Sequence, residues 1–234
     1  MAEPRHPGEI LARAVRYPYE APLHSFVQTG AHTVELPRGA EPDLGGREAV
    51  LAYGANASPE VLARKLAALP ELPLPLIYAE LVGFDVVYSA HVSLYGAVPA
   101  TLQRSPGTHA PVHVAYPTPA QLAALAATEP NYELRELGGF EIHSEIGVEG
   151  PPRLRAFVSR HGCLAIDEAE VALAAVEAKP RRFRAMGEVE VLEHVRHLLA
   201  PELDLERFVE SSLDPGLAHA RTAVLRGNAI PLAG

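Results

Sequence analysis

The stretch Leu51-Ala52-Tyr53-Gly54-Ala55-Asn56, followed directly by Ser58-Pro59-Glu60, decides which fold we expect. Its apolar start is typical of an interior strand over residues 48–53, and Gly54 permits a sharp turn after it. Ser58 and Pro59 favour the first positions of a helix, which we expect over residues 59–69. Such a junction directs backbone N–H groups into one small space, where they can hold a carboxylate or a developing oxyanion.

A second stretch, Leu125-Ala126-Ala127-Thr128-Glu129-Pro130-Asn131-Tyr132, places a solitary acid where an alanine-rich helix ends. This helix should begin at Pro119, with Thr118 as its N-cap. Glu129 lies at its end, and the phenol of Tyr132 follows shortly after. A turn rich in donors together with one carboxylate suggests chemistry on an amide.

The composition excludes several classes of partner and site. With 20 basic and 29 acidic side chains, the formal charge of −9 repels nucleic acid and anionic lipid, so we expect neither as a partner. No apolar run approaches the roughly 20 residues that cross a bilayer, and no signal peptide is evident, so we expect a cytoplasmic protein. Cys163 is the only cysteine, which favours a satisfied, half-buried thiol over a nucleophile, and the 11 histidines form no metal-binding motif. We therefore expect no metal and no cofactor.

The pattern along the chain indicates one α+β core with additions at both ends. We expect an N-terminal arm over residues 1–45, a core over residues 46–162 and a helical C-terminal extension, residues 163–234, packed on the core. In the first core helix, five residues recur at helical spacing on one face: Val61, Leu62, Lys65, Leu66 and Leu69. Strand signals cover residues 76–88, 97–103 and 112–116, and an antiparallel meander covers 132–137, 140–146 and 154–159. The extension should hold helices at 167–178, 189–199, 203–211 and 215–225.

At these residues the chain resembles the γ-glutamylcyclotransferase family, over roughly residues 48–160. Tyr53-Gly54-Ala55-Asn56 stands where the family has Tyr-Gly-Ser-Asn. Pro99-Ala100-Thr101-Leu102 then lies in a strand, and the helix ending at Glu129 follows in the family's order. Two departures are Ala55 in place of the serine and Pro130 in place of the family's common glycine after the acid.

The resemblance implies a mixed, largely antiparallel sheet or small barrel with flanking helices around a cavity. It also implies an enzyme that cyclises a γ-glutamyl amine or γ-glutamyl amino acid to 5-oxoproline and releases the amine, without metal or cofactor. Glu129 would be the general acid and base. Gly54, Ala55 and Asn56 would donate hydrogen bonds to the γ-glutamyl head, Tyr53 would close one side of the pocket, and Tyr132 would be a further donor.

Other interpretations stay open at this point. The altered Ala55 position permits a related amide or lyase-type reaction on another small acyl group, or a binding module for a small molecule or protein. Without the resemblance, Glu129 is a solvated helix-end acid, Tyr53 a core aromatic and Tyr132 the start of a strand. His91 lies in a loop and faces either the cavity or solvent. The helical tail would either line the pocket or form a homodimer interface.

Overall fold

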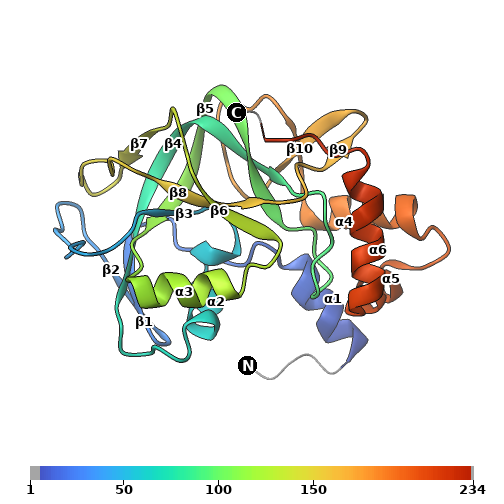
Figure 1. Cartoon of the computed structure of the whole chain (residues 1–234), viewed down its shortest axis with the longest axis horizontal. Helices are drawn as coiled ribbons and strands as arrows, with labels where there is room; N and C mark the ends of the chain where they lie inside the picture. Colours follow the sequence, from blue (N-terminus) through green and yellow to red (C-terminus); the bar gives the residue numbers. More distant parts are fainter. Residues whose placement is uncertain (1–5, 233–234) are drawn as a thin grey trace.

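The structure is a computed structural model that describes residues 6–232, and this part of the chain is an α+β protein built on one mixed sheet (Figure 1). The strands are β1 (Phe26–Thr29), β2 (His32–Glu35), β3 (Val50–Ala52), β4 (Leu74–Tyr88), β5 (Ala100–Ala115), β6 (Tyr132–Glu136), β7 (Glu141–Ser144), β8 (Arg155–Ser159), β9 (Ala165–Ile166), β10 (Ala169–Leu173) and β11 (Arg184–Met186). The helices are α1 (Pro7–Val15), α2 (Pro59–Lys65), α3 (Pro119–Ala127), α4 (Glu188–Leu199), α5 (Leu205–Ser211) and α6 (Pro215–Arg226).

The long antiparallel hairpin of β4 and β5 forms the spine of the sheet. The main path runs β11-β10-β4-β5-β3-β8-β6, and β3 pairs antiparallel with β5 but parallel with β8. The mixed sheet is therefore confirmed. The barrel is not: β11 and β6 end the path without pairing to each other, so within residues 6–232 the sheet stays open. The segment between β4 and β5, residues 89–99, contributes to the cavity described below.

Strand partners differ from the expected meander. β6 pairs antiparallel with β8, as local alternation suggests, but β7 pairs with β4 instead of with its neighbours in sequence. The prediction of a three-strand meander is therefore wrong. Alternation of apolar and polar residues marks a strand without naming its partner, because partners are selected by packing between distant segments.

The helix predicted over residues 167–178 is also wrong. Asp167 and Glu168, with φ of 53° and 63°, form a tight turn between β9 and β10. β10 then pairs with β4 at Val87 and with β11 in parallel, and its last three residues are buried. The alanine-rich sequence favours a helix locally, but pairing with β4 and β11 buries residues 171–173, and that burial outweighs the intrinsic preference.

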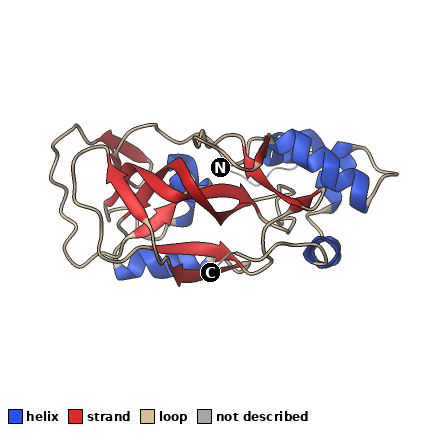
Figure 2. Cartoon of the chain, turned by 90° about the horizontal axis from the view of Figure 1, so that it is seen from above, coloured by secondary structure: helices blue, strands red, loops and turns tan. Residues whose placement is uncertain are grey.

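The segments on either side of the expected core complete the same sheet. From the N-terminal side, β1 pairs with β4, and from the C-terminal side β10 does so too. The helices predicted at 189–199, 203–211 and 215–225 are confirmed as α4, α5 and α6, with small shifts of their ends. α1 packs against α5, so a helix near the beginning of the described chain contacts the helical C-terminal extension. Figure 1 and Figure 2 together show α1, α4, α5 and α6 on one side of the molecule, with α2 and α3 on the other side of its centre.

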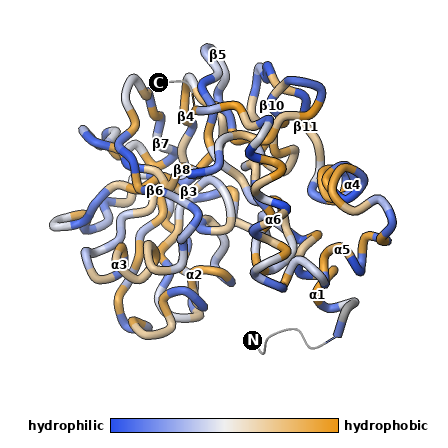
Figure 3. Tube along the Cα trace, turned by 45° about the vertical axis from the view of Figure 1, so that its right-hand side comes forward, coloured by the Kyte–Doolittle hydropathy of each residue, from blue (hydrophilic) through white to orange (hydrophobic). Residues whose placement is uncertain are grey.

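Two apolar clusters hold these parts together. The larger joins the sheet to α1, α4 and α5 through buried residues such as Ile10, Val191 and Phe208. The second packs α2 and α3 on the sheet through Leu62, Leu122 and their neighbours. Hydrophilic stretches lie mainly in the peripheral loops and turns (Figure 3). Within the described residues no helix is both long and apolar enough to cross a membrane.

Candidate functional site

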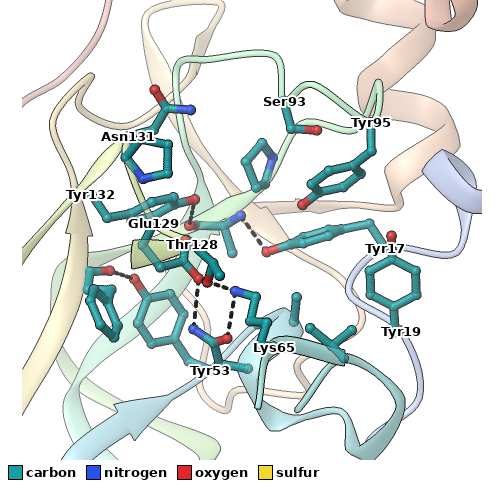
Figure 4. A pocket seen from close by; sticks show the side chains of 18 of the residues that line it. Tyr17, Tyr19, Tyr53, Lys65, Ser93, Tyr95, Thr128, Glu129, Asn131 and Tyr132 are labelled. Atoms are coloured by element: carbon teal, nitrogen blue, oxygen red, sulfur yellow. Dashed lines mark hydrogen bonds and ion pairs between the residues drawn. The ribbon is translucent and has the colours of Figure 1, made fainter. Parts of the chain in front are cut away.

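A cavity of about 260 Å³ lies where β3 ends, between α2, the β4–β5 connection and the end of α3 (Figure 4). All six residues predicted for the site line it: Tyr53, Gly54, Ala55, Asn56, Glu129 and Tyr132. Three further tyrosines face it, namely Tyr17 and Tyr19 after α1 and Tyr95 from the β4–β5 connection. The fold thus brings together two sequence segments that lie far apart in the chain, and it encloses them with an aromatic wall.

The carboxylate of Glu129 is held from the direction of the turn that follows β3. Asn56 Nδ2 donates to Glu129 Oε1 at 3.0 Å, and Lys65 Nζ lies 2.5 Å from the same oxygen. Lys65 Nζ also donates to Asn56 Oδ1 at 2.9 Å, so the three side chains close a triangle. The Lys65 and Glu129 side chains are only 12% and 14% exposed. Neither contact uses Glu129 Oε2, so one carboxylate oxygen is left for a ligand.

Lys65 is the functional residue that the sequence analysis missed. It falls on the inward stripe of α2 together with Val61, Leu62 and Leu66, all three of which are buried. A lysine on an otherwise apolar face is unusual, because burying an ammonium without a partner is costly. That position was the available signal: it predicts an acidic partner in the interior, although it does not identify Glu129.

Asn56 has a different role from the one expected. It belongs to a 3₁₀ turn, Ala55–Ala57, which separates β3 from α2. Its side-chain amide is committed to Glu129 and Lys65, so Asn56 positions the acid. The backbone N–H groups of Gly54 and Ala55 have no acceptor within residues 6–232, and both residues line the cavity. Ala55 has no hydroxyl, so its contribution at this position is its N–H and a methyl group.

Gly54 is required by a close approach of two segments. A Cβ atom at this position would lie 2.7 Å from the hydroxyl oxygen of Tyr17. That oxygen is fixed, because it accepts the backbone N–H of Ala100 at 2.7 Å. Tyr17 is buried, and burial raises the pKa of its hydroxyl well above the usual range, so the hydroxyl stays protonated. The turn can therefore pass beside Tyr17 only without a side chain.

The two tyrosines predicted for the site line the cavity with their rings and direct their hydroxyl groups to the backbone. Tyr53 donates to the carbonyl of Phe157. Tyr132 donates to the carbonyl of Ala100 at 2.8 Å. Burial raises the pKa of both phenols, with a smaller contribution from the charge of Glu129. Tyr53 thus closes one side of the cavity as expected, but the hydroxyl hydrogen of Tyr132 is already used and is not offered to a ligand.

Cys163 is buried, its Sγ lies 3.7 Å from the carbonyl of Leu102, and burial raises the pKa of its thiol to about 12. Cys163 is thus fully buried where the sequence suggested a half-buried thiol, and such a thiol does not ionise near neutral pH. In the part of the chain that the structure describes, no three His, Cys, Asp or Glu side chains gather as metal ligands.

Fold and site together define an α+β protein with a small, tyrosine-walled cavity around one paired carboxylate. No protein-family model matches the chain, and no curated protein matches it at a significant level. What this site does is therefore argued from its own geometry.

Proposed function

We propose that the protein is a γ-glutamylcyclotransferase-like enzyme that cyclises a γ-glutamyl amine or γ-glutamyl amino acid to 5-oxoproline. One observation carries the proposal: the Glu129 carboxylate and the turn at residues 54–56 line one cavity, where Asn56 of the turn holds the carboxylate. A volume of about 260 Å³ suits a small, folded substrate. The order of the motifs, with Tyr53-Gly54-Ala55-Asn56 before the helix that ends near Glu129, supports the same family.

The reaction requires proton transfer and a defined substrate geometry. The α-ammonium of the γ-glutamyl group gives a proton to Glu129 Oε2, and the freed amine attacks the γ-carbonyl carbon to form the new C–N bond. The tetrahedral oxyanion meets the unused N–H groups of Gly54 and Ala55. Glu129 then gives its proton to the nitrogen of the departing amine as the old C–N bond breaks, and it takes up the second proton of the new ring nitrogen, which leaves with the released amine as its ammonium. The substrate supplies its own nucleophile, so the reaction consumes no water and forms no covalent intermediate with the enzyme.

The neighbours of Glu129 have clear functions within this scheme. Lys65 and Asn56 fix Oε1 and so direct the free Oε2 toward the cavity. Holding a reacting group in one geometry contributes several kcal/mol to catalysis in general. The tyrosine rings lower the polarity around the carboxylate, which strengthens each of these electrostatic interactions.

The test is direct. Purified protein is offered a panel of γ-glutamyl amides, and release of 5-oxoproline is followed by chromatography. We expect turnover, and we expect Glu129→Gln to reduce kcat by about 100-fold or more, the usual contribution of a general acid and base. Glu133→Gln is the matched control, because Glu133 lies nearby on β6 with its side chain 55% exposed. Equal activity of Glu129→Gln and the unmodified protein would contradict the proposal.

A second candidate function is a binding module for a small molecule. The observation that favours it is the ion pair itself, because a carboxylate neutralised by Lys65 also serves as a purely structural support. A related amide or lyase-type reaction on another small acyl group uses the same atoms. The panel separates all three: saturable binding without turnover supports the module, and turnover without 5-oxoproline supports the related reaction.

A further inference from the structure

Two buried polar atoms at the cavity have no partner within the described residues. They are the hydroxyl oxygen of Tyr19 and Nε2 of His91, and both residues line the cavity. A buried polar atom without a hydrogen bond costs free energy, so such atoms are rare in folded proteins. Both belong to residues of one cavity, where a ligand can supply the missing hydrogen bonds.

The contacts of His91 determine which of its nitrogens is free. His91 is 1% exposed, and its Nδ1 lies 2.6 Å from Ser89 Oγ. The Ser89 hydroxyl donates its hydrogen to Ser159 Oγ at 2.6 Å, so it must accept from Nδ1–H of His91. The proton of the neutral imidazole is therefore on Nδ1, and Nε2 carries a lone pair. Nε2 is consequently an acceptor, and it needs a donor from the ligand.

The surroundings of His91 keep it neutral and fixed. Its ring packs against Tyr132, with centroids 5.6 Å apart, and against His161 at 4.9 Å. Burial, and then the neighbouring His161, lowers the pKa of His91 to about 3. An imidazole with such a pKa stays uncharged at neutral pH and cannot donate through Nε2. A cationic or amide N–H group is the complementary partner.

We propose that His91 is a substrate-binding residue whose Nε2 accepts a hydrogen bond from the α-ammonium of a γ-glutamyl ligand. The inference rests on the proposed function, whose substrate carries that ammonium. An ammonium has three N–H donors, so one can bind His91 while another meets the free oxygen of Glu129. This assigns the recognition of the amino-acid head to His91 and makes a free α-amine a requirement of the site.

The experiment compares two ligands that differ only in this group: L-glutamate, and glutarate, which lacks the amine. Binding of each is measured by titration calorimetry near neutral pH. For the unmodified protein we expect L-glutamate to bind at least roughly tenfold more tightly, the usual effect of a hydrogen bond to a charged group. In His91→Phe the preference should fall to near unity. In His91→Gln, whose amide oxygen can replace Nε2 as acceptor, most of it should return.

His161 supplies the matched control. Its Nδ1 is also buried without a partner, but the residue does not line the cavity. His161→Phe should therefore keep the preference for L-glutamate. A second measurement needs no variant: the ¹⁵N resonance of His91 Nε2 should shift on addition of L-glutamate and stay in place with glutarate.

The outcomes separate this inference from the proposed function. Turnover of γ-glutamyl amides with an unchanged preference in His91→Phe, or an unmoved Nε2 resonance, overturns the role of His91 and leaves the enzyme proposal standing. If no γ-glutamyl amide is turned over but L-glutamate binds in a way that depends on His91, the enzyme proposal is wrong. The role of His91 in binding the α-ammonium then still stands. If neither ligand binds the unmodified protein, the inference is wrong.

Discussion

Replacing Lys65 by methionine should destabilise the protein and free the acid of the site. The Lys65 and Glu129 side chains, 12% and 14% exposed and 2.5 Å apart, lie much nearer to a buried pair than to a surface one. Surface pairs contribute up to about 1 kcal/mol, and removing one member of a buried pair costs about 3–5 kcal/mol. We therefore expect Lys65→Met to lower the free energy of unfolding by about 2–3 kcal/mol. Methionine keeps the apolar part of the side chain, so the decrease in the free energy of unfolding measures the removal of the ammonium charge.

A double-mutant cycle isolates the pair. Glu129→Gln keeps the hydrogen bond from Asn56 but removes the charge, and we expect it to cost about 1–2 kcal/mol. The double variant Lys65→Met with Glu129→Gln leaves no unpaired charge, so its loss should be smaller than the sum of the single losses. A coupling energy of about 1 kcal/mol or more follows. Urea unfolding at low salt, read as a two-state transition, measures each corner of the cycle.

An exposed pair serves as the comparison. Arg135 and Glu133, whose side chains are 53% and 55% exposed, lie 3.7 Å apart on β6. The cycle of Arg135→Met and Glu133→Gln should give a coupling below about 0.5 kcal/mol. If the Lys65 and Glu129 losses also add without coupling, the two side chains do not form a desolvated pair in solution, and the assignment of Lys65 as the support of Glu129 is refuted.

Three further predictions concern the backbone turn and two buried titrating groups. Gly54→Ala brings a Cβ to 2.7 Å from the Tyr17 hydroxyl and should cost about 1–3 kcal/mol in urea unfolding, partly recovered by Tyr17→Phe in the same chain. Gly187→Ala, with no atom within 4 Å of the new Cβ, is its control, and an equal loss there would contradict the steric explanation. Burial lowers the pKa of His113 from 6.5 to about 4, so between these values the unfolded state binds more protons and stability is lost as the pH falls. The stability advantage of the unmodified protein over His113→Gln should shrink by about 2 kcal/mol between about pH 7.5 and pH 5, and parallel pH profiles would refute this. Burial raises the pKa of Glu188 well above 4.5, so the folded state keeps a proton that the unfolded state releases. Relative to Glu188→Gln, the unmodified protein should therefore lose about 1.4 kcal/mol per pH unit above about pH 5, and a difference that is constant with pH would show that Glu188 is ionised when folded.

Local patterns in the sequence were sufficient for several elements near the site. Thr118 caps α3 as predicted, and its hydroxyl and the Gln121 side chain form a reciprocal capping box. The strand before Gly54 and the end of the helix before Glu129 lie where their flanking residues indicate, because caps, prolines and apolar periodicity act over a few residues. Ser58 occupies the N-cap position of α2, yet its hydroxyl makes no capping bond and is buried without a partner.

The partners of these elements were decided by the tertiary structure. The sequence places Lys65 on an inward helix face, but only folding sets it against Glu129. It places His91 in a loop two residues after Ser89, and only folding brings Ser159 and His161 beside these two residues. Residues 169–173 form a strand because the edge of β4 was available to pair with it. Residue types and their spacing determine which secondary structure a short segment favours. Burial and ion pairing depend on contacts between distant segments, and these contacts form only when the whole chain folds.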